Sequence, residues 1–283
     1  MSRSLFLKPG GIGKHIPIDG SWFMPNVQRS GLQEYRHKRI PNARFFDLDT
    51  ICDKESPFPH MLPSAMVFSR EMGKLGLTRN DALVIYDTHG LFSAPRVYWT
   101  LQVFGHKGDV KMLEGGLPAY EAAGLPLEEG EPAFQGRSYG DAVYHAERVL
   151  GFEDLIQGIK AKDVEIVDAR PAARFTGEAP EPRAGLSSGH MPGAKSLPFN
   201  KLIRDGALLP AEELRQALAQ ADVDLRKRVV LTCGTGVTAC VLQAALESLG
   251  VEDAVVYDES WTGYADERRA GRLAGMVVKD WRE

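Results

Sequence analysis

The 283-residue chain has few cysteines, no long apolar run and no large excess of one charge. Three cysteines, an odd number, argue against a disulfide framework and favour a reducing compartment. Cys233 and Cys240 lack a second close pair of cysteines or histidines at zinc spacing, which argues against a structural metal. No apolar run approaches a membrane span, and a formal charge of −4 gives no reason to expect nucleic-acid or anionic-membrane binding. The remaining composition is that of a soluble globular protein.

The N-terminal segment is basic, with Lys8, Lys14 and His15 and no acidic residue before Asp19. Such a basic bias weakly indicates a mitochondrial presequence. However, Pro9 and three glycines would break an amphipathic helix there. We therefore favour a cytoplasmic location and leave mitochondrial residence open.

The most informative stretch is an apolar run at residues 229–231 that ends close to Cys233 and continues into a loop with Gly234 and Gly236. A helix-compatible segment follows at 239–249. A cysteine between a strand and a helix N-terminus lies where backbone N–H groups converge, and such a site favours negative charge. The pattern predicts that Cys233 is a thiolate nucleophile at neutral pH. The alternative is a buried strand-end cysteine.

The chain also reads as an internal duplication with an offset of about 144 to 151 residues. Residues 82–87 correspond to 228–233, residues 40–43 to 191–194, and residues 110–113 to 254–257. Alternating strands and helices in each half indicate an α/β fold in which each sheet is mostly parallel and flanked by helices. We predict a first domain at 1–127, a polar linker rich in glycine and proline at 128–146, and a second domain at 147–283.

The duplication assigns the chemistry to one half. Where the second half has Cys233, the first has Asp87, whose side chain cannot hold a transferable sulfur atom. The loop after Asp87 is one residue longer, so it need not cradle an anion. The first domain is therefore predicted to be catalytically silent, contributing scaffold and one wall of a cleft.

Residues 233–238, Cys-Gly-Thr-Gly-Val-Thr, resemble the active-site loop of 3-mercaptopyruvate sulfurtransferases, the two-domain branch of the rhodanese superfamily. The resemblance covers nearly the whole chain. It is carried by residues 45–49, 56–57, 60–63, 92–97, 115–117, 167–170, 174–175, 180–183 and 189–194. It implies a tandem pair of rhodanese-like domains. In the first of them, residues 1–18 are shorter than the corresponding stretch of relatives, which usually includes a helix.

The resemblance implies that Cys233 takes sulfur from 3-mercaptopyruvate as a persulfide, releases pyruvate and passes the sulfur to a second nucleophile. Gly234, Gly236, Val237 and Thr238 form the substrate loop, and the chemistry implies no metal or organic cofactor. The acceptor is a thiol, such as thioredoxin or a low-molecular-weight thiol.

Arg174 and Arg183 match the positions that the family uses to hold the mercaptopyruvate carboxylate. A guanidinium suits that role because it gives two parallel hydrogen bonds and stays charged. The alternative is that either arginine pairs with Glu178 or Glu181 on a solvated loop.

Asp49, His60 and Thr235 correspond to a Ser-His-Asp-like proton relay that the family builds across its domain interface. Threonine replaces the serine of many relatives here. The hydroxyl is retained, but the extra methyl restricts its rotamers.

Three other functions stay open. A thiosulfate sulfurtransferase could use the same nucleophile, although relatives that use thiosulfate resemble Cys-Arg-Lys-Gly-Val-Thr and carry two cations where this chain has Gly234 and Thr235. A persulfide relay protein would accept sulfur without a small donor, and would have no use for two carboxylate anchors. A cysteine phosphatase would need a longer loop with a closing arginine, which residues 238–242 lack.

Glu259 stands where the family commonly has glycine before Ser-Trp, which could alter acceptor access.

Overall fold

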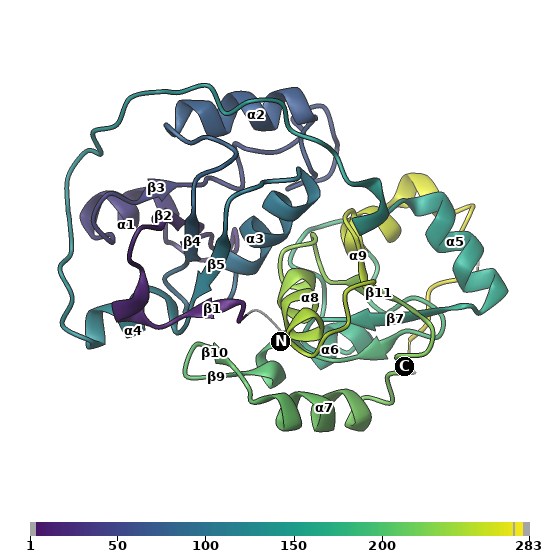
Figure 1. The fold of residues 1–283 in the computed structure, drawn as a ribbon. Helices are drawn as coiled ribbons and strands as arrows, with labels where there is room; N and C mark the ends of the chain where they lie inside the picture. The colour runs from purple at the N-terminus through teal and green to yellow at the C-terminus, as the bar shows by residue number, and fades with distance from the viewer. Residues whose placement is uncertain (1–3, 274, 280–283) are drawn as a thin grey trace. The chain divides into compact units, whose positions relative to one another are not determined.

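The structure is a computed structural model that describes residues 4–273 and 275–279. These residues form two compact units, each an α/β layer structure (Figure 1). The first unit comprises residues up to 145 together with residues 203–208, and the second comprises 146–202 and residues from 209 onward. The two units follow the internal duplication that the sequence predicts, apart from the short segment at 203–208.

Among the described residues, the first unit contains a five-stranded parallel sheet in the order β1-β5-β4-β2-β3. Its strands are β1 (Phe6–Leu7), β2 (Ile16–Asp19), β3 (Arg44–Phe45), β4 (Leu83–Tyr86) and β5 (Val110–Leu113). The helices are α1 (Gly31–His37), α2 (Ala65–Lys74), α3 (Ala94–Val103) and α4 (Gly116–Ala122), with a 3-10 turn, η1, at Pro9–Gly11. The central strand β4 is buried along its whole length, as expected of a parallel strand covered on both faces.

The second unit repeats this topology in the order β6-β12-β11-β7-β8, again with all neighbours parallel over the residues described. Its strands are β6 (Val149–Leu150), β7 (Val164–Asp168), β8 (Lys195–Ser196), β11 (Arg228–Thr232) and β12 (Val255–Tyr257). Its helices are α5 (Phe152–Ala161), α6 (Ala172–Thr176), α7 (Ala211–Gln220), α8 (Ala239–Ser248) and α9 (Ser260–Tyr264), with 3-10 turns η2 (Ala146–Arg148), η3 (Phe199–Leu202) and η4 (Glu267–Arg269). The predicted fold class is confirmed in both halves.

The core of the second unit lies on both faces of its sheet. On one face, Val230 of β11 packs with Leu155 of α5 and Trp261 of α9. On the other, Leu231 lines a small apolar cavity with Leu214 of α7 and Leu242 of α8. Successive residues of a strand point to opposite faces, so one short apolar run contributes to two core layers. This burial fixes the end of β11, and with it the position of Cys233.

The matched turns of the two halves also have the same geometry. Asn42 and Gly193 occupy equivalent positions and both have a positive φ, 61° and 75°. In each turn the alanine that follows donates its N–H to the residue three before it, Ile40 or Met191, at 3.0 and 3.1 Å. Asparagine is one of the few residues other than glycine that accept this conformation readily, which explains why the two sequences differ there without changing the turn.

Over residues 4–15, the described part of the chain before β2 forms a short strand and a 3-10 turn. Phe6 and Leu7 form the edge strand β1, paired in parallel with Met112 and Leu113 of β5. Pro9 opens the short 3-10 turn rather than an amphipathic helix. Residues 6–7 thus extend the sheet at its edge.

The polar segment predicted as a linker, residues 128–146, follows the first unit closely as far as residue 145. Glu128 forms a backbone bridge with Arg39, and the N–H groups of Arg137 and His145 donate to carbonyls of the first unit, each at 2.8 Å. Most of this segment is therefore packed by hydrogen bonds to its own unit, and the division between the units falls after residue 145.

One short hairpin, β9 (Ile203–Arg204) and β10 (Ala207–Leu208), is part of the first unit although it lies between elements of the second in the sequence. Its turn residue Gly206 packs against Gly90. A β-carbon on Gly90 would lie 2.6 Å from the Gly206 Cα, so the two backbones touch in a way that only glycine permits.

Candidate active site

Cys233 follows the last residue of β11 and is buried, with 2% of its surface exposed. The loop of residues 234–238 leads directly into α8, which begins at Ala239. Gly236 has a φ of 79°, in the left-handed region that glycine adopts without strain. Thr235 and Val237 of the same loop are buried, and Gly234 and Thr238 are partly exposed. The predicted arrangement of strand, cysteine, loop and helix is present.

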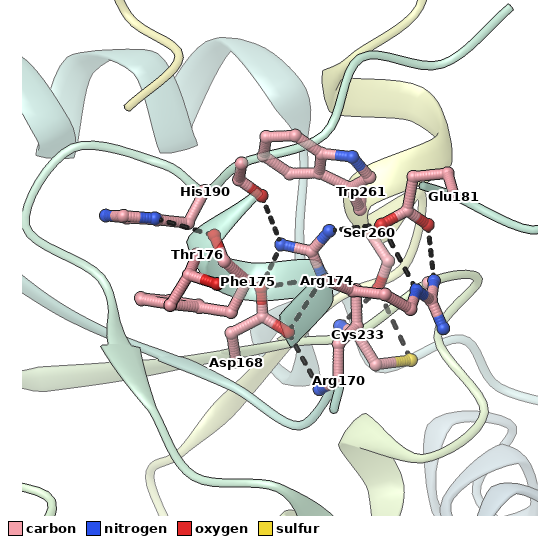
Figure 2. A network of polar contacts seen from close by, with 12 residues as sticks. Asp168, Arg170, Arg174, Phe175, Thr176, Glu181, His190, Cys233, Ser260 and Trp261 are labelled. Atoms are coloured by element: carbon pink, nitrogen blue, oxygen red, sulfur yellow. Dashed lines mark hydrogen bonds and ion pairs between the residues drawn. The ribbon is translucent and has the colours of Figure 1, made fainter. Parts of the chain in front are cut away.

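Ser260, at the start of α9, is a direct neighbour of Cys233 that sequence reasoning missed (Figure 2). Its Oγ accepts the Cys233 N–H at 3.1 Å, donates to the Tyr257 carbonyl at 3.0 Å and lies 4.0 Å from the Cys233 Sγ. Ser260 is fully buried and has a φ of 50°, a costly conformation for a residue with a side chain. Such strain is retained where the surrounding structure enforces it, and here it brings a hydroxyl to the sulfur.

The next residues of α9 form hydrogen bonds to the backbone of the cysteine loop. The Trp261 N–H donates to the Cys233 carbonyl and the Thr262 N–H to the Gly234 carbonyl, both at 2.9 Å, and the Thr262 hydroxyl donates to the same Gly234 carbonyl at 2.7 Å. Glu259 precedes this segment and is bonded to the Tyr257 hydroxyl at 3.0 Å and to Arg269. The glutamate at this position is therefore engaged within its own unit.

Arg174, on α6, lies against the cysteine loop. A β-carbon on Gly234 would come within 3.2 Å of the Arg174 Nη2, so the absence of a side chain at 234 leaves room for the guanidinium. Arg174 also pairs with Glu181: its Nε donates to Oε1 at 3.2 Å and its Nη2 donates to Oε2. This is the pairing that the sequence left open, but it is a buried contact, because the Glu181 side chain is only 2% exposed.

Arg170 completes this network, and the sequence assigned it no role. Asp168, the last residue of β7, accepts from its Nε at 2.9 Å and from its Nη2 at 2.6 Å. Glu181 accepts from its Nη1 at 2.8 Å, and the Gly189 carbonyl accepts from Nη2 at 2.8 Å. Burial alone would lower the pKa of Arg170, but the Asp168 and Glu181 carboxylates outweigh it and raise that pKa. Figure 2 shows the two arginines on either side of the Glu181 carboxylate.

The segment that follows Glu181 ends at His190, which packs against α6. Its ring stacks on Phe175 with 3.9 Å between centroids, and Nδ1 lies 2.9 Å from the Phe175 carbonyl. Arg183, the second predicted carboxylate anchor, lies in this segment and is half-buried. Its predicted contact with a donor stays a prediction.

Asp49 and His60, two members of the predicted relay, are adjacent in the first unit. The His60 Nε2 lies 3.1 Å from the Asp49 Oδ1, and the Trp22 indole N–H donates to both Asp49 oxygens at 3.2 Å. The hydrogen bond with His60 is the main cause that lowers the pKa of Asp49 below its ordinary value. Arg96 donates to the His60 carbonyl at 2.6 Å. The connection of this pair to Thr235, in the second unit, stays a prediction.

The loop after Asp87 differs from the expectation drawn from its length: it does cradle an anion, which is its own Asp87 carboxylate. Within the described residues, Oδ1 accepts the His89 N–H at 2.9 Å, and Oδ2 accepts the N–H groups of Phe92, Ser93 and Ala94, each at 2.8 Å. Asp87 is fully buried. The extra loop residue does not open the loop, because the carboxylate itself gathers the N–H groups at the start of α3.

Across residues 4–273 and 275–279, no group of three or more His, Cys, Asp or Glu side chains could hold a metal ion. Over the same residues, no helix has both the length and the apolar character needed to cross a membrane.

The rhodanese-like domain family model matches the chain twice, at residues 30–123 and 152–267. The chain is 41% identical over 272 residues to a probable 3-mercaptopyruvate sulfurtransferase of Schizosaccharomyces pombe, covering 94% of this chain and 90% of that protein. It is 40% identical to thiosulfate/3-mercaptopyruvate sulfurtransferase 1, mitochondrial, of Arabidopsis thaliana, with coverage of 88% and 71%. The crystal structure of the 3-mercaptopyruvate sulfotransferase SseA from Escherichia coli superposes with a TM-score of 0.84 at 35% identity, covering 92% of this chain and 99% of that one.

Proposed function

This chain belongs to the family of proteins with rhodanese-like domains, and on that premise we propose that it is a 3-mercaptopyruvate sulfurtransferase. The observation that carries the proposal is the position of Cys233 in a loop at the N-terminus of α8, with the Arg174 guanidinium against Gly234. The proposed nucleophile and a proposed carboxylate-binding group thus lie close together in one unit. Mercaptopyruvate carries its sulfur and its carboxylate within a few bonds of each other.

In the first half-reaction, the Cys233 thiolate attacks the sulfur of mercaptopyruvate. A sulfur–sulfur bond forms, the carbon–sulfur bond breaks, and its electron pair remains on carbon as the enolate of pyruvate, which then gains a proton. In the second half-reaction, a thiolate acceptor attacks the outer sulfur and restores the Cys233 thiolate. The persulfide is anionic, and the N–H groups of a loop at a helix N-terminus favour that charge. The filled loop at Asp87 supports this assignment, because the same topology there already holds a carboxylate.

Arg174 and Arg183 are proposed as the groups that hold the donor carboxylate, and residues 234–238 as the loop that surrounds the reacting sulfur. Asp49, His60 and Thr235 are proposed as the proton relay. The short Asp49–His60 contact supports the first half of that relay, since a carboxylate bonded to one ring nitrogen fixes the orientation of the imidazole. If a His60→Gln variant retained the full rate of pyruvate release, this result would show that the first unit supplies no group to the reaction.

Two further assignments belong to this proposal. The first unit, which has Asp87 in place of a cysteine, is proposed to be catalytically silent. Acceptors of the family are thiols, and thioredoxin or a small thiol is proposed as the acceptor here. The protein is proposed to be cytoplasmic, with mitochondria as the alternative, since one relative is described as mitochondrial.

Intact-mass measurement of the reduced protein after addition of mercaptopyruvate or thiosulfate tests the proposal, with Cys233→Ser as control. We expect one added sulfur on the wild type with mercaptopyruvate, none on Cys233→Ser, and catalytic release of pyruvate and sulfide once a dithiol is present. A preference for thiosulfate would instead make the protein a thiosulfate sulfurtransferase, a function that the Arabidopsis relative's name includes. Failure with both donors would favour the persulfide relay.

A further inference from the structure

Glu181 is the carboxylate that joins the two arginines of the candidate site. It accepts from Arg170 at 2.8 Å and from two nitrogens of Arg174, and its side chain is 2% exposed. A carboxylate this deeply buried is retained only with charged or hydrogen-bonding partners. Here the partners are the guanidinium groups themselves, so Glu181 determines how each of them is oriented.

Arg170 is fully occupied by the protein. Its nitrogens donate to Asp168, Glu181 and the Gly189 carbonyl, and its guanidinium lies over the Trp261 ring, 4.2 Å from the ring centroid. The side chain is 1% exposed. Arg170 therefore acts as a fixed support that holds Glu181 in place, and the donor must be bound by another group.

Arg174 is held differently. Glu181 takes the edge formed by Nε and Nη2, which leaves the edge formed by Nη1 and Nη2 facing away from Glu181. Nη2 is also the atom that approaches Gly234, next to Cys233. A guanidinium has a second edge that can bind a carboxylate through two parallel hydrogen bonds. Because Glu181 binds the edge formed by Nε and Nη2, the edge formed by Nη1 and Nη2 is the one available to a donor at the cysteine loop.

The charges of this network are balanced. Asp168 and Glu181 are two carboxylates, and Arg170 and Arg174 are two guanidinium groups. A donor with one carboxylate can be bound through directed hydrogen bonds at such a site. These four groups offer a small dianion no net positive charge to offset its desolvation, and Arg183 is the one further cation proposed at the donor site.

We propose that Glu181 is a positioning residue that sets donor specificity, by fixing which edge of Arg174 faces the donor and by cancelling the charge that a dianionic donor would require. This inference rests on the proposed function and explains how the same site selects between sulfur donors. Mercaptopyruvate, with its single carboxylate, is the favoured class of donor, and thiosulfate, a dianion, is disfavoured.

The test compares steady-state kinetics with mercaptopyruvate and with thiosulfate for the full-length wild type, Glu181→Gln, Glu181→Asp and Glu178→Gln. Glutamine keeps the size of the side chain but removes its charge and one acceptor for Arg174. We expect the mercaptopyruvate KM of Glu181→Gln to rise about tenfold with a smaller change in kcat, as for a lost charge-assisted hydrogen bond. We expect its thiosulfate kcat/KM to rise several-fold.

Glu181→Asp separates orientation from charge, and it serves if the glutamine variant folds poorly. Aspartate keeps the charge but is one methylene shorter, so the mercaptopyruvate KM rises while thiosulfate use stays as low as in the wild type. Glu178 is exposed and lies three residues earlier, so Glu178→Gln is a matched change of charge. An equal gain in thiosulfate use by Glu178→Gln would show that overall charge, and not this contact, sets the preference.

A double-mutant cycle with Arg174→Ala decides whether Glu181 acts through Arg174. On the Arg174→Ala background, Glu181→Gln should raise the mercaptopyruvate KM no further, whereas full additivity of the two effects would overturn the inference. If the wild type turns over mercaptopyruvate but Glu181→Gln leaves both donors unchanged, the inference fails and the proposed function stands. If the wild type does not use mercaptopyruvate, the proposed function itself fails.

Discussion

Replacing Asp87 by alanine should destabilise the first unit strongly, although the residue lies in the unit that lacks Cys233. Its carboxylate accepts the N–H groups of His89, Phe92, Ser93 and Ala94, and Asp87 itself is fully buried. Each hydrogen bond to a charged acceptor contributes about 1.5–3 kcal/mol, but bonds that share one acceptor are not additive. We expect Asp87→Ala to lower the free energy of unfolding by about 3–5 kcal/mol, the range for loss of one partner of a buried charged contact.

The measurement is differential scanning calorimetry, because two units need not unfold as one transition. At roughly 2–4 °C per kcal/mol for units of this size, the transition of the first unit should fall by about 6–20 °C. Asp53→Ala is the matched control, since Asp53 accepts one backbone N–H at 2.9 Å in the same unit, and it should cost about 1 kcal/mol or less. A loss below about 1 kcal/mol for Asp87→Ala would refute the reasoning.

The same variant offers a second, independent readout. With the carboxylate removed, the N–H groups at the start of α3 are left without their acceptor, and a small anion can take its place. Formate should therefore raise the unfolding temperature of Asp87→Ala more than that of the wild type or of Asp53→Ala. An identical response of all three proteins would show that the loop is not an anion cradle.

Three further predictions follow from individual residues. Burial raises the pKa of Asp19 to about 7, well above the ordinary value of an aspartate, so stability should fall as the pH rises between about 4 and 7. Asp19→Asn should raise the unfolding temperature at pH 8 but not at pH 4. Asp49 behaves oppositely: because His60 lowers its pKa, its contribution is present above the ordinary aspartate range and is lost in stronger acid, and Asp49→Asn should reduce this loss in an acid titration followed by circular dichroism. Ser260→Ala should slow persulfide formation by about tenfold in rapid-quench measurements, since it removes the hydroxyl 4.0 Å from the Cys233 Sγ, and an unchanged rate would show that this hydroxyl only shapes the backbone.

The fold and the position of Cys233 between a strand and a helix could be predicted from the sequence because both depend on local patterns. Short apolar runs, their repetition in the two halves and the loop after Cys233 were sufficient for the parallel sheets, the helix beginning at Ala239 and the equivalence of Asp87 and Cys233. The equivalence of the turns at Asn42 and Gly193 was also readable, because both residue types adopt positive φ angles.

The polar network around Arg174 could not be predicted in the same way. The pairing of Glu181 with Arg170 and Arg174 depends on how an irregular segment folds back over β7, and residues 7 and 11 apart in a loop carry no periodic signal. The role of Ser260 depends on a positive φ at a residue that rarely adopts one. The length of the loop after Asp87 indicated that it need not bind an anion. Loop length gives no information about the Asp87 side chain, whose own carboxylate accepts the N–H groups of that loop.

The hairpin at residues 203–208 has a consequence for anyone who wishes to separate the two halves. Over the described residues the chain passes between the units after 145, after 202 and after 208, so no single cut yields two independent products. A fragment beginning at residue 146 would carry the hairpin without Gly90, against which Gly206 packs. An isolated second unit should therefore be built by joining residue 202 to residue 209 with a short new turn, and cleavage after residue 145 alone should leave the two pieces associated.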